Sequence, residues 1–365
     1  MDLPAPTFSF SIPSIHDGVK LECRVYLPNE LRNIQSARAS TSTASTGRSS
    51  WKPRGAIIAH PYTRLGGCYD DPVVSFVGGE LLQAGYLVGT FNFRGAGGSE
   101  GQTSWTAKSE LEDYVSFYGF MLLCLRQLNN ASSLIGGNLL GLTLESSALP
   151  EEGDSDIQLI LGGYSFGSLI ASHAPDVDVI LELFGSDSNT DPSTPINKIG
   201  RVARKIAAAS TRHFNPSNPD VLVGPATDTD IGTADDSQPR ASPTMSIAYL
   251  LVSPLLPPVS HFLTCFSTLS LNVGVKEGQG RLVHTRPDHQ LSTHSSLALY
   301  GDGDTFTSAP KLQRWSAEMA RVPQSRFQSG EIGGAGHFWR EDGVEVKARG
   351  RLREWLRLIG SDRIE

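Results

Sequence analysis

One serine in the sequence stands where a chain can expose a hydroxyl group as a nucleophile. Ser165 is the centre of Gly163-Tyr164-Ser165-Phe166-Gly167, which follows a short apolar run and precedes residues with helical spacing. In such a strand–turn–helix the residues two before and two after the serine pack against each other, so both must be very small. The amide of Phe166, at the start of the helix, would then point at an oxyanion. The pattern predicts a nucleophilic serine; the alternative is an ordinary turn.

A serine hydroxyl attacks only when a base takes its proton, so a histidine is required. We favour His337, which follows the small residues 333–336 after the last predicted strand, over the alternative of a surface turn histidine. Asp302 or Asp304, both just past a predicted strand, would fix the imidazole tautomer. We favour Asp304, because the chain should clear the strand end before the carboxylate turns inward. The alternative for both is a turn-forming role.

The loop after the first central strand is expected to supply a second donor to the oxyanion. It reads His60-Pro61-Tyr62-Thr63-Arg64-Leu65-Gly66-Gly67. Because Pro61 has no N–H group, the amide of Tyr62 is the predicted donor. His60, like the other histidines apart from His337, is expected to be a hydrogen-bonded or solvated side chain rather than a base.

Alternating strands and helices are predicted to position these residues. Two N-terminal strands, 8–12 and 20–27, flank an Asp17-Gly18 turn that is typical of a hairpin. Further strands are expected at 55–60, 86–93, 157–162, 247–252, 297–300 and 326–332, and helices at 72–84, 109–127, 166–174, 310–320 and 344–359. This alternation favours a mostly parallel sheet with helices on both faces, an α/β fold.

We expect a single domain over residues 1–365, with three loop-rich additions. Within residues 31–53, nine of the fifteen residues from 36 to 50 are Ser or Thr, which predicts a disordered loop. Residues 129–156 are predicted to be a polar insertion. Residues 175–243 are predicted to be a second insertion and a possible lid. Its basic amphipathic segment, 195–210, is expected to be a packing or lid helix rather than a membrane-surface helix.

The composition argues against several classes of protein. The chain has 365 residues, with 31 Lys and Arg against 38 Asp and Glu and a formal charge of −7, so nucleic-acid binding is not expected. No run approaches the ~20 apolar residues of a membrane span, and no secretory signal is visible. The four cysteines share no CxxC spacing, so neither a metal site nor a disulfide is expected. A cytoplasmic protein without stable membrane insertion is the prediction.

Four groups of residues together resemble the α/β-hydrolase superfamily, and within it the small, dienelactone-hydrolase-like serine hydrolases. They are His60-Pro61 with Gly66-Gly67, then Asn92-Phe93-Arg94-Gly95 followed by Gly97, Ser99 and Gly101, then Gly163 to Gly167, and finally Gly336-His337-Phe338. The resemblance covers about residues 55–358 apart from the insertions. It implies an eight-stranded, mostly parallel sheet, a triad of Ser165, Asp304 and His337, and hydrolysis of an ester-like bond without a cofactor.

We therefore expect a serine hydrolase that acts on a small-molecule acyl substrate. Ser165 would attack an ester or thioester, His337 would move the proton, and Asp304 would orient His337. The amides of Phe166 and Tyr62 would hold the oxyanion. Two alternatives stay open. One is a biosynthetic tailoring enzyme that transfers or cyclises the acyl group in a specialised pathway, and the other is a non-catalytic binding protein on the same fold. Neither the substrate nor the oligomeric state is predicted.

Overall fold

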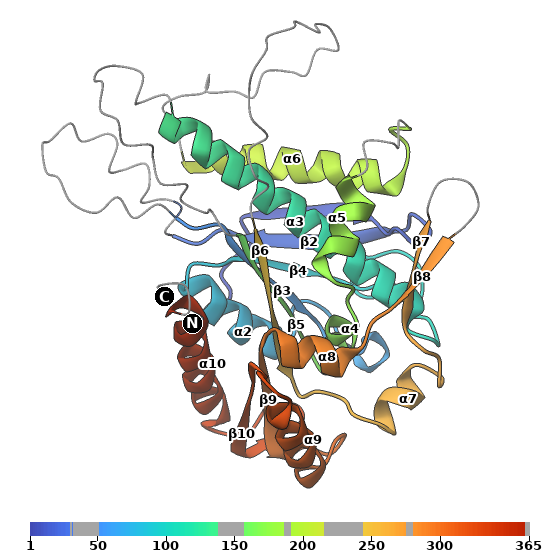
Figure 1. The fold of residues 1–365 in the computed structure, drawn as a ribbon, viewed down its shortest axis with the longest axis vertical. Helices are drawn as coiled ribbons and strands as arrows, with labels where there is room; N and C mark the ends of the chain where they lie inside the picture. The colour runs from blue at the N-terminus through green and yellow to red at the C-terminus, as the bar shows by residue number, and fades with distance from the viewer. Residues whose placement is uncertain are drawn as a thin grey trace, which may run out of the picture.

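An eight-stranded sheet forms the centre of the protein, which we describe from a computed structural model (Figure 1). The structure describes residues 1–29, 31, 51–137, 157–185, 191–214, 244–274 and 280–361. In sheet order the strands are β1 (Phe8–Pro13), β2 (Lys20–Tyr26), β4 (Leu87–Phe91), β3 (Arg54–Ala59), β5 (Ile157–Tyr164), β6 (Met245–Val252), β9 (Ser295–Gly303) and β10 (Phe327–Gly336).

The N-terminal hairpin is the antiparallel part of the sheet. β1 pairs antiparallel with β2, and β2 pairs antiparallel with β4. The remaining neighbours in this sheet, in the order β4, β3, β5, β6, β9 and β10, pair in parallel. At the turn, Gly18 has a φ of 81° and donates its N–H to Ser14 O at 2.9 Å. A positive φ favours glycine there, so the predicted hairpin and its turn are both confirmed.

Helices cover both faces of the sheet (Figure 1). On one face α2 (Pro72–Gln83) and α10 (Val344–Ser361) lie side by side. The core of the other face is built with α3 (Lys108–Gly137), α4 (Phe166–Ser172), α5 (Val177–Gly185), α6 (Pro195–Phe214), α8 (Pro287–Thr293) and α9 (Ala309–Arg321). Strand β6 shows how the core divides: Tyr249 and Leu251 face the second group, and Leu250 and Val252 face α2 and α10.

The strand order and the helices on both faces confirm the predicted α/β-hydrolase fold class. The chain passes from β3 to β4 on one side and then to β5 on the other, so the order reverses at β3. In open α/β sheets, ligands bind outside the carboxyl ends of the strands at such a point. Among the described residues, no helix combines the length and apolar character needed to cross a membrane.

Several elements differ from the sequence prediction. Helix α3 runs ten residues past its predicted end, from Gln127 to Gly137, and so takes in the start of the predicted insertion at 129–156. Helix α6 packs against α3 and buries Ile199 and Ala203, so this part of the 175–243 insertion is a covering helix. The lid prediction stays a prediction, since residues 186–190 and 215–243 lie outside the described residues, as do 32–50 and 138–156.

Candidate active site

The turn between β5 and α4 holds Ser165 in a strained backbone conformation. Its φ is 55° and its ψ is −113°, a combination that residues other than glycine rarely adopt. A Cβ atom on Gly163 would lie 2.2 Å from the carbonyl carbon of Gly167. The two glycines therefore pack against each other as predicted, and neither position has room for a side chain.

The start of α4 is pressed against the end of β3. A Cβ atom on Gly167 would lie 2.4 Å from Ala59 O and 2.7 Å from His60 O. This contact brings Ser165 beside the loop that follows β3, at the point where the strand order reverses. The serine thus lies at the edge of the sheet where the topology favours a ligand site.

Three side chains from three strand ends form one hydrogen-bonded chain. His337 Nε2 lies 2.9 Å from Ser165 Oγ, and His337 Nδ1 lies 2.7 Å from Asp304 Oδ2. All three residues are buried, with at most 7% of their surface exposed. Since the carboxylate accepts a hydrogen bond from Nδ1–H, the lone pair on Nε2 faces the serine hydroxyl. Asp302 is exposed instead, and its carboxylate accepts the Gly334 N–H at 2.7 Å.

Asp304 is held as a carboxylate by its hydrogen bonds. Burial on its own would raise the pKa of Asp304, but the hydrogen bond and the charge of His337 lower it. The N–H groups of Phe306 and Thr307 add to this effect by donating to Asp304 Oδ1 at 2.8 and 3.0 Å. The pKa is therefore lowered below its ordinary value, and the carboxylate can stabilise a positive charge on the imidazole.

Aromatic rings surround His337. The ring of Phe306 lies 4.2 Å from the imidazole and that of Phe338 lies 5.5 Å from it, centre to centre. The Tyr164 hydroxyl donates to His337 O at 2.8 Å and so connects His337 to the residue before Ser165.

Strand β10, which precedes His337, differs from the prediction. β10 continues to Gly336 with an irregularity between Ile332 and Gly336, so His337 follows the strand directly.

The backbone amides of Tyr62 and Phe166 are available to a ligand. Among the described residues neither donates a hydrogen bond. The rings of the two residues lie 5.1 Å apart, so the loop after β3 and the start of α4 are neighbours. The Tyr62 carbonyl accepts the N–H groups of Leu65 and Gly67 at 3.0 and 3.2 Å, which closes this loop into a tight turn. Two free N–H groups next to a buried serine can bind a negatively charged oxygen.

His60 is a hydrogen-bonded side chain, one of the two forms expected from the sequence, and it fixes the start of that loop, which the sequence analysis did not predict. It is fully buried; Phe93 N–H donates to His60 Nε2 at 2.9 Å, and Nδ1 lies 2.6 Å from Pro61 O. Nε2 is therefore the acceptor and Nδ1–H the donor. Burial lowers the pKa of His60 to about 4, so the ring is neutral. A histidine at the end of an otherwise apolar strand, followed by a proline, was the available signal.

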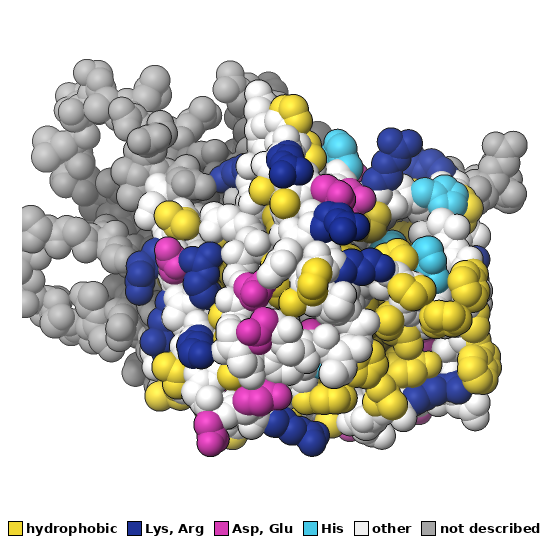
Figure 2. All heavy atoms as spheres, turned by 90° about the horizontal axis from the view of Figure 1, so that it is seen from below, with side chains coloured by type: hydrophobic (Ala, Val, Ile, Leu, Met, Phe, Trp, Pro, Cys, Tyr) yellow, Lys and Arg dark blue, Asp and Glu magenta, His cyan; other side chains and the backbone are white. Residues whose placement is uncertain are grey.

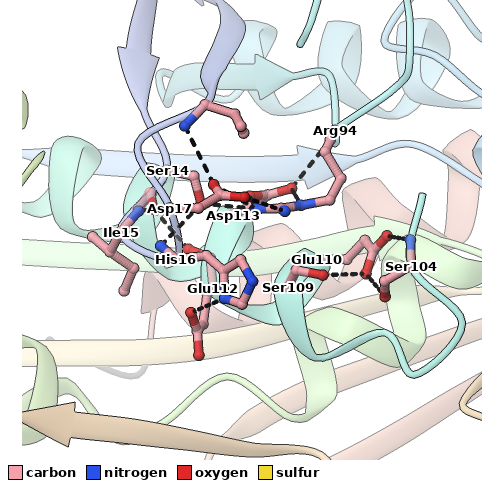
Figure 3. A network of polar contacts seen from close by, with 12 residues as sticks. Ser14, Ile15, His16, Asp17, Arg94, Ser104, Ser109, Glu110, Glu112 and Asp113 are labelled. Atoms are coloured by element: carbon pink, nitrogen blue, oxygen red, sulfur yellow. Dashed lines mark hydrogen bonds and ion pairs between the residues drawn. The ribbon is translucent and has the colours of Figure 1, made fainter. Parts of the chain in front are cut away.

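A second polar network supports the loop after β4 (Figure 3). The Arg94 guanidinium binds both carboxylate oxygens of Asp113 on α3, at 2.9 and 2.7 Å, and Asp17 of the hairpin turn at 3.0 Å. Burial alone would lower the pKa of Arg94, but the pairing with Asp113 and Asp17 raises it. The network joins the N-terminal hairpin, the loop after β4 and α3, so Arg94 has a structural role at the edge of the site. Among the described residues, no group of three or more His, Cys, Asp and Glu is arranged to hold a metal ion.

No protein-family model and no curated protein matches this sequence. Comparison with solved structures finds similarity to an α/β serine hydrolase homologue from Coxiella burnetii, with 15% identity, a TM-score of 0.42 and coverage of 96% of this chain and 98% of that chain. An α/β serine hydrolase without lid from Xanthomonas campestris is 15% identical, with a TM-score of 0.45 and coverage of 98% and 96%. Est1E from Butyrivibrio proteoclasticus, with ferulic acid bound, is 14% identical, with a TM-score of 0.43 and coverage of 96% and 100%.

Proposed function

We propose that this protein is a serine hydrolase that cleaves a carboxylic ester or thioester through an acyl-enzyme on Ser165. The observation that carries the proposal is the chain of two hydrogen bonds, 2.9 Å from Ser165 Oγ to His337 Nε2 and 2.7 Å from His337 Nδ1 to Asp304. The strained backbone of Ser165 supports it, because strain at a buried serine between a strand and a helix is typical of a nucleophile.

In the first half of the reaction, Ser165 Oγ forms a bond to the substrate carbonyl carbon and its proton passes to His337 Nε2. The electron pair of the carbonyl moves onto the oxygen, which the amides of Tyr62 and Phe166 stabilise. When the carbonyl re-forms, the bond to the leaving oxygen or sulfur breaks and Nε2 returns the proton to it. Water repeats the sequence on the acyl-enzyme and releases the acid. Asp304 stabilises the imidazolium each time.

Fluorophosphonate labelling followed by an ester panel tests the proposal. We expect the probe to label Ser165 in the native protein and to leave Ser165→Ala unlabelled, and we expect hydrolysis of aryl esters and thioesters by the native protein alone. Ser168→Ala is a matched control, since Ser168 is also a buried serine of this segment but its hydroxyl donates to Ser165 O. Esterase activity that survives in Ser165→Ala would refute the assignment of the nucleophile.

The labelling, together with analysis of the products formed with and without an added amine or alcohol, separates the two alternatives. A folded protein without label or turnover indicates a binding protein on this fold. A product that is always transferred to an added amine or alcohol, and never to water, indicates an acyltransferase. The proposed function predicts the free acid as the product.

A further inference from the structure

Large apolar side chains are exposed around the candidate site, and they lie in loops and short helices that follow the carboxyl ends of strands. Figure 2 shows a broad apolar area on the face that carries α7 (Val259–Leu263). Between 49% and 69% of the surface of each side chain is exposed; they are Leu65, Trp105, Phe262, Phe266 and Phe338, which we call the aromatic rim. At roughly 150–250 Å² for each aromatic side chain, four aromatic residues exposed to this extent present on the order of 500 Å². An exposed apolar area of this size is typical of a binding surface.

Several contacts join the aromatic rim to the reacting groups. Phe338 follows His337 directly, and its ring lies 6.0 Å from that of Phe306. The loop between β6 and α7 begins beside the nucleophile, because Ser165 N–H donates to Val252 O at 2.8 Å. This loop then contacts the Phe306 loop, where Leu256 N–H donates to Thr307 Oγ1 at 3.3 Å. The aromatic rim is therefore continuous with the candidate site.

The turn after α7 lies within electrostatic range of the loop after β3. Burial raises the pKa of the Tyr62 hydroxyl, Arg64 lowers it, and Glu110 and Cys265 raise it, so Cys265 of this turn is near Tyr62. On that loop Arg64 stacks on Trp105, 4.1 Å from the ring centre. Leu65 and Trp105 thus form the part of the rim that the loops after β3 and β4 carry.

The backbone of this turn indicates that Phe266 is exposed for a function. Cys265 and Phe266 have φ values of 45° and 58°, where glycine or asparagine is favoured. Phe266 N–H donates to His261 O at 2.7 Å, which holds this conformation. A phenylalanine here is unfavourable both for the backbone and for its exposure to water. Strained residues of this kind cluster at ligand sites.

We propose that the α7 side of the aromatic rim, formed by Phe262 and Phe266, whose rings lie 5.4 Å apart, binds an extended apolar acyl chain of the ester substrate; this rests on the proposed function. The carbonyl carbon of the substrate carries three groups. Its oxygen points to the amides of Tyr62 and Phe166, and its leaving group lies beside His337, which returns the proton to it. The third group, the acyl chain, then lies along the loop from β6 to α7.

The test is an acyl-length series from acetyl to hexanoyl on one constant aryl alcohol, measured below the critical micelle concentration. If each methylene buries about half of its surface on the rim, kcat/KM rises about twofold per methylene and at least tenfold over the series. Phe262→Ser and Phe266→Asn should reduce the hexanoyl-to-acetyl ratio of kcat/KM to less than about threefold. Asparagine tolerates the backbone of residue 266, so the second variant should fold normally.

The control is Leu358→Ser, which removes an equally apolar exposed side chain from α10, and its ratio should equal that of the native protein. A native ratio near one, with acetyl ester hydrolysis that requires Ser165, would overturn this inference and leave the proposed function standing. Rates that rise only above the critical micelle concentration would also overturn it, in favour of docking on aggregated lipid. Absence of turnover and of phosphonate labelling would overturn both.

Discussion

Replacing His60 should remove a specific part of the acid sensitivity of this protein. His60 is fully buried and neutral; it accepts the Phe93 N–H and binds Pro61 O, immediately before Tyr62. Burial lowers its pKa from 6.5 to about 4. No charged group contributes to this shift, so a neutral replacement does not disturb an ion pair.

The sign and the size of the effect follow from proton linkage. In the unfolded chain His60 takes up a proton below about pH 6.5, whereas in the folded protein it does so only near pH 4. The unfolded state is therefore stabilised relative to the folded state as the pH falls. The stability that neutral His60 maintains at pH 7.5 is therefore lost between about pH 6.5 and pH 4. At 1.36 kcal/mol per pKa unit the whole loss is roughly 3 kcal/mol, of which about 2 kcal/mol is lost by pH 5.

Urea unfolding at pH 7.5 and pH 5.0, followed by tryptophan fluorescence, measures this loss. At pH 7.5 His60→Gln should be less stable than the native protein by about 1–3 kcal/mol, because two buried hydrogen bonds are disturbed. At pH 5.0 the difference in the free energy of unfolding should have changed by about 2 kcal/mol in favour of the variant. His60→Asn should show the same change with a different starting value. A difference between native protein and variant that is the same at both pH values would refute the buried, neutral histidine.

Three further outcomes are expected. Gly167→Ala places a Cβ atom 2.4 Å from Ala59 O, so thermal unfolding should show a loss of about 1–3 kcal/mol; an unchanged melting temperature would contradict the close contact. Asp304→Asn should lower kcat for ester hydrolysis by about 10³–10⁴-fold, because it no longer fixes the His337 tautomer; Asp302→Asn should stay within about threefold, since Asp302 is exposed and its carboxylate binds the Gly334 N–H rather than His337. Arg94→Ala leaves the buried Asp113 carboxylate without its partner, and urea unfolding should show a loss of about 3–5 kcal/mol; a loss below 1 kcal/mol would refute the structural role of this pair.

Much of the fold could be predicted from the sequence because the signals are local. Apolar runs between glycine-rich turns marked all eight strands of the main sheet, within a few residues at their ends. The start of α2 has a local signal of this kind, since the Asp71 carboxylate caps the helix by accepting the Val73 N–H at 2.8 Å and Pro72 follows it. Short elements were missed: α5, α7, α8 and the hairpin of β7 (Ser270–Gly274) and β8 (Gly280–His284). Elements of five to nine residues carry too little periodicity to be recognised, and their packing partners decide whether they form.

Local sequence alone accounts for the residue types of the site and for the turn that carries Ser165. The reason is steric and local: only glycine fits at positions 163 and 167 when the chain turns so sharply. The approach of His337 to Ser165, across 172 residues of sequence, depends on the tertiary structure. The sequence favoured Asp304 but left Asp302 open, and in the folded protein His337 pairs with Asp304 while Asp302 binds the Gly334 N–H. These contacts depend on how far β9 and β10 extend and where β10 becomes irregular. Most of the parallel strands are buried on both faces and read as continuous apolar runs, so they lack the alternating pattern that would specify their register locally.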